Sequence, residues 1–146
     1  NDWFMDEVRA CIGYYQMKDL FFNLKVRRSV ADRYNAAFQD HPKISILDLP
    51  ENNSPSYYQY AIILDDEVNR DNMIKILKEE YEVSSKRIYL ATHQEPIFKD
   101  LNFDSKTLYQ TENTLDQSLC LPTYCTISDK EVQYVICSVL AVLEKI

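Results

Sequence analysis

The sequence contains a single glycine, Gly13, among its 146 residues. Loops that hold a phosphate through backbone amides need several glycines for close approach, so this chain cannot build a Walker loop or a dinucleotide-binding loop. Long hydrophobic runs are also missing, because no apolar stretch approaches the roughly 20 residues that cross a bilayer. We therefore expect neither a signal peptide nor contact with a membrane.

Cysteines are few and irregularly spaced. The four are Cys11, Cys120, Cys125 and Cys137, and no two of them form a Cys-x-x-Cys pair. The spacing of Cys120 and Cys125 fits no familiar zinc pattern. A chain of this length buries enough surface to fold without disulfides or metals. We expect free thiols in a reducing cytoplasm and no metal site.

Positive charge is in deficit. The chain has 23 acidic residues against 16 lysines and arginines, which gives a net charge of −7 and a pI near 4.8. Binding to nucleic acid or to an anionic membrane needs a concentrated basic face, so we expect no such partner. The one basic cluster, at residues 25–28, falls inside a helical pattern and is interpreted as a solvated helix face.

Hydrophobic periodicity predicts where the helices lie. Apolar residues recur every three or four positions at about 5–15, 21–38 and 70–81, and a last helix follows the capping box Ser128–Glu131. A shorter helix is expected at 111–119. The first of these helices has an apolar stripe of Val8, Cys11, Ile12 and Tyr15, which must pack on something.

Three β-rich runs, at 44–49, 57–64 and 87–90, predict short strands, and residues 91–108 are interpreted as an irregular loop. We predict an α+β fold (an α/β two-layer arrangement), in which helices pack a small antiparallel or mixed sheet of three or more strands. One domain is expected over residues 1–146. It has a helical lead-in over 1–40 and an α/β core over 41–146 that ends in a C-terminal helix.

Several short motifs occur in a fixed order along the chain. They are Met5–Gly13, Arg28–Tyr34, Tyr57–Tyr60 before an apolar strand, Arg70–Asp71 opening a helix with Leu77–Lys78, the loop with Tyr89, His93, Pro96 and Phe98, and Leu121–Tyr124. Taken together they resemble the C-terminal region of the DegT-type family of sugar aminotransferases. Members of that family are pyridoxal phosphate (PLP) enzymes of the aspartate-aminotransferase fold.

The resemblance implies a small domain like the C-terminal minor domain of fold-type I PLP enzymes, packed beside a large cofactor domain that precedes it. The lysine that forms the Schiff base lies upstream of the matched region in this family. We therefore expect no catalytic residue here, no PLP bound to this chain alone, and no activity without the N-terminal PLP domain and a homodimer partner.

The resemblance also assigns candidate binding residues. His93, Tyr89 and Tyr58 would line the nucleotide-sugar site, and Asn1 would reach the cofactor phosphate of the neighbouring subunit. Asp2 and Phe4 occupy the positions of the family's Asn-x-Arg motif, and neither residue binds phosphate well. The alternatives are a loop histidine satisfied by backbone groups and tyrosines that serve the core or an interface.

The function implied is transfer of an amino group from a donor such as glutamate to a keto-sugar nucleotide, with this domain closing the substrate site and contributing dimer contacts. Two alternatives stay open. One is a non-catalytic, stand-alone binding or interaction domain, and the other is part of a PLP-dependent sugar dehydratase on the same fold.

Overall fold

A three-stranded antiparallel sheet forms the centre of the molecule, with its strands in the order β1–β2–β3. The computed structural model describes residues 4–50, 52–98 and 105–146. The strands are β1 (Ile44–Ile46), β2 (Tyr60–Leu64) and β3 (Ser118–Leu121). In the described ranges the helices are α1 (Glu7–Lys18), α2 (Leu20–Phe38), α3 (Arg70–Tyr81), α4 (Ser105–Gln117) and α5 (Asp129–Lys145), with 3-10 turns η1 (Thr92–Gln94) and η2 (Pro96–Phe98).

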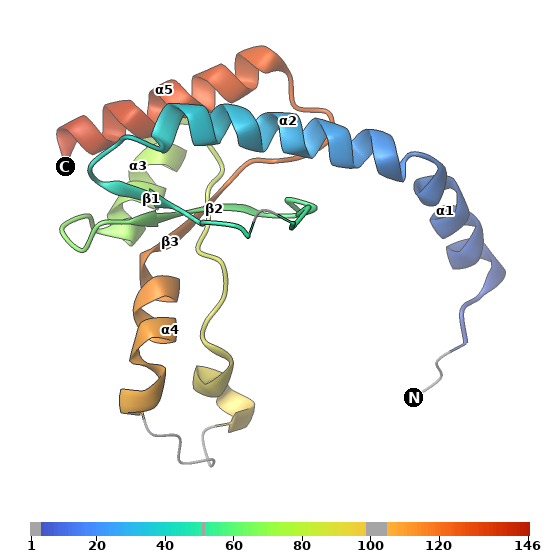
Figure 1. Ribbon diagram of the computed structural model, residues 1–146, viewed down its shortest axis with the longest axis horizontal. Coiled ribbons are helices and arrows are strands. Elements are labelled where there is room, and N and C mark those ends of the chain that lie inside the picture. Colours follow the sequence, from blue (N-terminus) through green and yellow to red (C-terminus); the bar gives the residue numbers. More distant parts are fainter. Residues whose placement is uncertain (1–3, 51, 99–104) are drawn as a thin grey trace.

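One face of the sheet is covered by α2, α3 and α5, whereas α4 projects away on the opposite side (Figure 1). Alternate residues of β2 point into the covered face, so Tyr60, Ile62 and Leu64 are at most 2% exposed. Ile62 pairs with Ile46 on one side and with Leu119 on the other. These strand residues and the buried residues of the three helices form one hydrophobic core.

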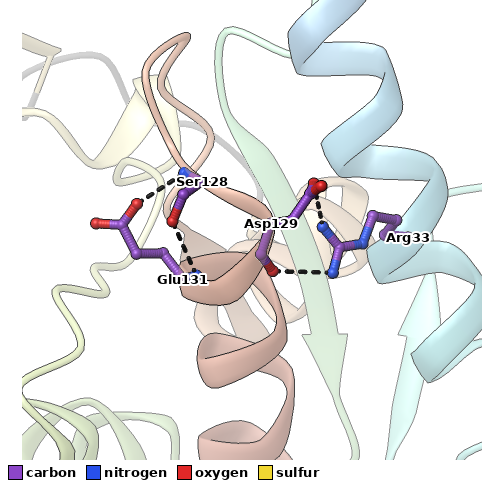
Figure 2. Close-up of polar contacts among 4 residues, drawn as sticks. All are labelled: Arg33, Ser128, Asp129 and Glu131. Atoms are coloured by element: carbon purple, nitrogen blue, oxygen red, sulfur yellow. Dashed lines mark hydrogen bonds and ion pairs between the residues drawn. The ribbon is translucent and has the colours of Figure 1, made fainter.

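The start of α5 is held by side chains from two parts of the chain (Figure 2). Ser128 Oγ accepts from the Glu131 amide at 3.3 Å, and the Ser128 amide donates to Glu131 Oε2 at 2.7 Å, so the predicted capping box is confirmed. Arg33 of α2 donates to the Asp129 carboxylate at 2.8 Å and to the Asp129 carbonyl at 3.0 Å. The helices α2 and α5 therefore contact each other through these polar groups as well as through the hydrophobic core.

Two buried tyrosines tie α2 to the sheet. The Tyr34 hydroxyl donates to the Pro122 carbonyl at 2.9 Å, and the Tyr60 hydroxyl donates to Asn35 Oδ1 at 2.7 Å. Their ring centroids are 4.9 Å apart. Burial raises the pKa of both phenols above the ordinary value, because the charged form would lose its hydration.

The strand predicted at 87–90 is wrong. In this part of the chain Lys86, just before the predicted strand, pairs with β3 through an isolated antiparallel bridge to Cys120, and residues 87–91 have no regular structure. The helix expected at 111–119 starts earlier and ends at Gln117, because Ser118 begins β3, a strand that periodicity did not predict. Apolar strand residues that follow a helix without a glycine or proline carry no boundary signal.

The first helix also differs from expectation. It forms where predicted, but no residue of α1 is buried, and the stripe of Val8, Cys11, Ile12 and Tyr15 is exposed. Within the described residues, α1 contacts α2 and extends past the end of the sheet (Figure 1). Periodicity predicted an apolar face correctly, and no other described part of the chain covers that face.

The buried tyrosines predict an alkaline loss of stability. Unfolded tyrosine loses its proton at about pH 10, whereas Tyr34 and Tyr60 keep theirs when folded, so the free energy of unfolding should fall as pH rises above about 10. Urea denaturation from about pH 8 to about pH 11 measures this fall. In the Tyr34→Phe/Tyr60→Phe double variant the fall should be smaller, although each lost hydrogen bond costs about 1 kcal/mol at neutral pH. Tyr109→Phe, at an exposed position, is the control and should follow the wild type. An unchanged alkaline slope in the double variant would contradict this.

A second prediction concerns the end of α3. Glu82 caps this helix in the left-handed conformation (φ 55°), and the amides of Glu82 and Val83 both donate to the Leu77 carbonyl. A residue with a Cβ atom pays about 1–2 kcal/mol to adopt this left-handed conformation. Glycine avoids that cost, but it loses more conformational freedom on folding, so the net gain from glycine is smaller. Glu82→Gly should raise the free energy of unfolding by about 0.5–1 kcal/mol. Glu79→Gly, inside the same helix, should lower it by about 1 kcal/mol. Equal losses for the two variants would rule out relief of strain at Glu82.

Candidate functional site

A cavity of about 390 Å³ lies between α2, the segment before β2, the bridge at Lys86 and the turn after β3. Its walls include Arg27, Tyr58, Gln59, Lys86, Thr123 and Tyr124, and none of the described aspartates or glutamates lines it. Arg27 is placed there by α2, and Lys86 by the bridge that its backbone makes with Cys120. Two cations from distant parts of the sequence therefore share one cavity.

Arg27 is the unusual residue of this cavity. Its Nε is buried and has no hydrogen-bond partner among the described residues. The guanidinium carbon lies 6.0 Å from the centre of the Tyr58 ring, at the outer limit of a cation–π contact. An unpartnered buried donor is costly, so this position favours an acceptor that the described residues do not provide.

The ammonium of Lys86 acts on its neighbour Cys120. Burial raises the pKa of the Cys120 thiol, and the positive charge of Lys86 opposes that rise. All four cysteines are free thiols, and Cys120 is the buried one. A raised pKa keeps Cys120 protonated near neutrality, so it contributes a neutral wall and not a nucleophile.

Of the three substrate-binding residues predicted from the sequence, Tyr58 lines this cavity, and Tyr89 contacts a residue of its wall. Tyr58 lines it directly and is 71% exposed. Gln59 also lines it, and the Gln59 side-chain amide donates to the Tyr89 hydroxyl at 3.3 Å. Tyr58 and Tyr89 are therefore connected through one intervening side chain, and both keep exposed rings.

His93 is held elsewhere, in an arm formed by η1, η2 and α4 that projects away from the sheet (Figure 1). Its Nε2 lies 2.7 Å from Glu112 Oε1, which joins η1 to α4, and the two side chains are 13% and 25% exposed. The third predicted residue is thus fixed by a carboxylate. Asn1, proposed to reach a cofactor phosphate, lies outside the described residues.

Sequence reasoning missed Arg27 because it interpreted residues 25–28 as a solvated face. Lys25 is exposed, as that interpretation requires, but Arg27 is half-buried. The signal was present in the spacing, since Arg27 precedes Ala31, Tyr34 and Phe38 at four-, three- and four-residue steps. Arg27 therefore continues the buried stripe of α2 by one turn.

Two features are absent from the described residues. Across the described residues, no group of three histidine, cysteine, aspartate or glutamate side chains is arranged to hold a metal ion. In the same ranges no helix combines the length and the hydrophobicity needed to cross a bilayer.

Comparison with known proteins identifies the class. Residues 2–140 match the model of the DegT/DnrJ/EryC1/StrS aminotransferase family, and the chain belongs to this family. The spore coat polysaccharide biosynthesis protein SpsC of Bacillus subtilis (strain 168) is 28% identical over 136 residues, covering 90% of this chain and 35% of SpsC. The UDP-4-amino-4,6-dideoxy-N-acetyl-beta-L-altrosamine transaminase of Campylobacter jejuni (serotype O:2) is 23% identical, covering 97% of this chain and 38% of that enzyme.

Solved structures agree with the family match. Spr1654 from Streptococcus pneumoniae, in its pyridoxamine phosphate form, has a TM-score of 0.86 and 25% identity, covering 97% of this chain and 36% of that one. The predicted fold class and family are thereby confirmed. The chain spans little more than a third of the curated relatives it matches. Aminotransferases of this family use PLP.

The contacts and exposure of the lysines show whether any described lysine could hold PLP covalently. Lys43 donates to the carbonyls of Leu143 and Ile146 at 3.0 and 2.6 Å, and Lys145 pairs with Glu80 at 2.7 Å. The other lysines with described side chains are exposed: Lys18, Lys25, Lys75, Lys78, Lys86 and Lys130. A Schiff-base lysine needs a desolvated pocket that lowers its pKa. None of these described lysines has one, so they do not fit the role.

The contact between His93 and Glu112 predicts a local effect on the arm. In Glu112→Gln a neutral acceptor replaces a carboxylate, which costs about 1 kcal/mol and should speed amide hydrogen exchange along α4 about fivefold. Exchange measured by mass spectrometry on peptides covering residues 108–117 tests this. Asp116→Asn, exposed on the same helix, is the matched control and should leave the rates unchanged. Equal rates in the two variants would mean that the pair does not hold the arm.

Proposed function

We propose that residues 1–146 form a single domain, the C-terminal domain of a PLP-dependent sugar aminotransferase that moves an amino group from a donor such as glutamate to a keto-sugar nucleotide. In this proposal the domain closes the substrate site and contributes dimer contacts. The Schiff-base lysine and the remaining cofactor contacts belong to an N-terminal domain, so the chain does not catalyse the reaction alone.

The family match combined with the coverage of relatives is the observation that carries the proposal. Nearly the whole chain matches, yet it corresponds to about a third of each relative. The unsuitability of the described lysines as cofactor anchors supports the same division of labour. The name of the Campylobacter enzyme specifies a UDP-linked amino sugar, which supports a nucleotide sugar as the substrate class.

The surface of α1 supports a role in contacts with further polypeptide. Exposed apolar side chains crowd this helix and the start of α2: Met5, Val8, Ile12, Tyr14, Tyr15, Met17, Phe21 and Phe22. A groove of about 670 Å³ runs between the two helices, and Gly13 lines it. A Cβ added at Gly13 would meet no atom within 4 Å. An apolar surface of this size on a soluble domain favours an interface.

A chimera tests the proposed activity. The matching segment of the Campylobacter transaminase would be replaced by this chain, and the chimera would be given PLP, 2-oxoglutarate and the UDP-linked amino sugar of that enzyme's name. We expect formation of glutamate above that of the same enzyme truncated before the segment. Retention of PLP, read from its absorbance, and the mass in sedimentation report whether the chimera is assembled.

The outcomes separate the two parts of the proposal. A chimera that retains PLP and dimerises but forms no glutamate would contradict the assignment as an aminotransferase domain. A soluble chimera that neither retains PLP nor dimerises would contradict the role in site closure and dimer contacts.

A further inference from the structure

We propose that the cavity between Arg27 and Lys86 is a binding site for a phosphoanion, and that its ligand is the diphosphate of the sugar nucleotide. The inference rests on the proposed function only for the identity of that ligand. The affinity of the cavity for a free diphosphate does not depend on transamination and is tested separately.

The distribution of charge is the first argument. The chain carries a net charge of −7, yet the described residues that line this cavity include two cations and no carboxylate. A larger neighbouring cavity of about 630 Å³ shares Ser84, Pro122 and Tyr124 with it, but its charged groups are Glu82 and Glu131. An anion would be repelled from the larger cavity and attracted to the smaller one. The two cavities are therefore distinguished by charge across a shared wall.

The state of Arg27 is the second argument. A solvated arginine would satisfy Nε with water, whereas the Nε of Arg27 is buried and has no partner among the described residues. A guanidinium offers Nε and Nη donors in a planar fork that matches two oxygens of a phosphate group. The Tyr58 ring lies on one side of this fork, with its centre 6.0 Å from the guanidinium carbon.

Lys86 and the neutral residues complete the site. Lys86 is exposed, and none of the ion pairs among the described residues involves its ammonium, so its charge is available to a ligand. Gln59 and Thr123 add an amide and a hydroxyl to the walls. The cavity has a volume of about 390 Å³, which is at the small end of the range for ligand sites. This volume is large enough for a diphosphate.

Calorimetric titration of the full 146-residue chain with inorganic pyrophosphate tests the site. We expect saturable binding that weakens as salt is added, because counter-ions screen the cations. Loss of one charge-assisted partner should weaken binding about tenfold or more in Arg27→Gln and in Lys86→Met. Arg27→Lys should recover part of the affinity, since it keeps the charge but loses the fork.

Lys25→Met is the matched control, because it removes the same charge from an exposed position on α2 two residues from Arg27. It should bind pyrophosphate like the wild type. Circular dichroism confirms that each variant is folded. Absence of saturable binding by the wild type, or equal weakening in Lys25→Met and Lys86→Met, would overturn the site.

Competition identifies the ligand. A UDP-sugar that displaces pyrophosphate from the wild type supports the diphosphate of a sugar nucleotide. Pyrophosphate binding that a UDP-sugar cannot displace overturns that ligand, whatever the chimera shows about activity. Displacement by glutamate at the same concentration as pyrophosphate overturns the preference for a phosphoanion, because it would reveal a general carboxylate site.

Discussion

Burial of one face of the short sheet under α2, α3 and α5 is the constraint on which the other features of the molecule depend. Three strands of three to five residues cannot hold together by their own hydrogen bonds, so Ile62 and Leu119 need the helices above them. Tyr34 and Tyr60 make this packing specific, because each buried hydroxyl has one partner that only the native alignment of α2 provides.

The same packing divides α2 into a half without buried residues and a half that contributes to the core. Its buried residues begin at Val30, whereas the residues from Leu20 to Ser29 contain none. Arg27 lies one turn before the core begins, and it borders both the cation-lined cavity and the groove beside α1. A polypeptide that covers the apolar surface of α1 would therefore also form a wall of the cavity. The proposed interface and the proposed anion site are thus parts of one region.

Local patterns predicted the elements whose cause is local. The helix at 70–81 and the capping box at Ser128 and Glu131 were both predicted correctly, because caps and periodicity act within a few residues. The strand Ser118–Leu121 was missed since its identity depends on pairing with Tyr60–Ile63, far away in sequence. The motifs that resembled the DegT-type family gave Tyr58 and Tyr89, and the structure connects these two through Gln59. They gave no indication of Lys86, which enters the cavity only because its backbone bridges to Cys120.

Arg27 shows how a chain so rich in acid can keep a half-buried cation whose Nε has no hydrogen-bond partner among the described residues. With 23 acidic residues available, a carboxylate could have been placed on a neighbouring element, as Asp129 is placed beside Arg33. Such a pair would satisfy Nε permanently and would neutralise the cavity. An unpaired buried Nε raises the free energy of the chain, and in the proposed site the bound oxyanion recovers that cost. The lack of a partner for Arg27 Nε among the described residues is therefore better explained by binding than by folding.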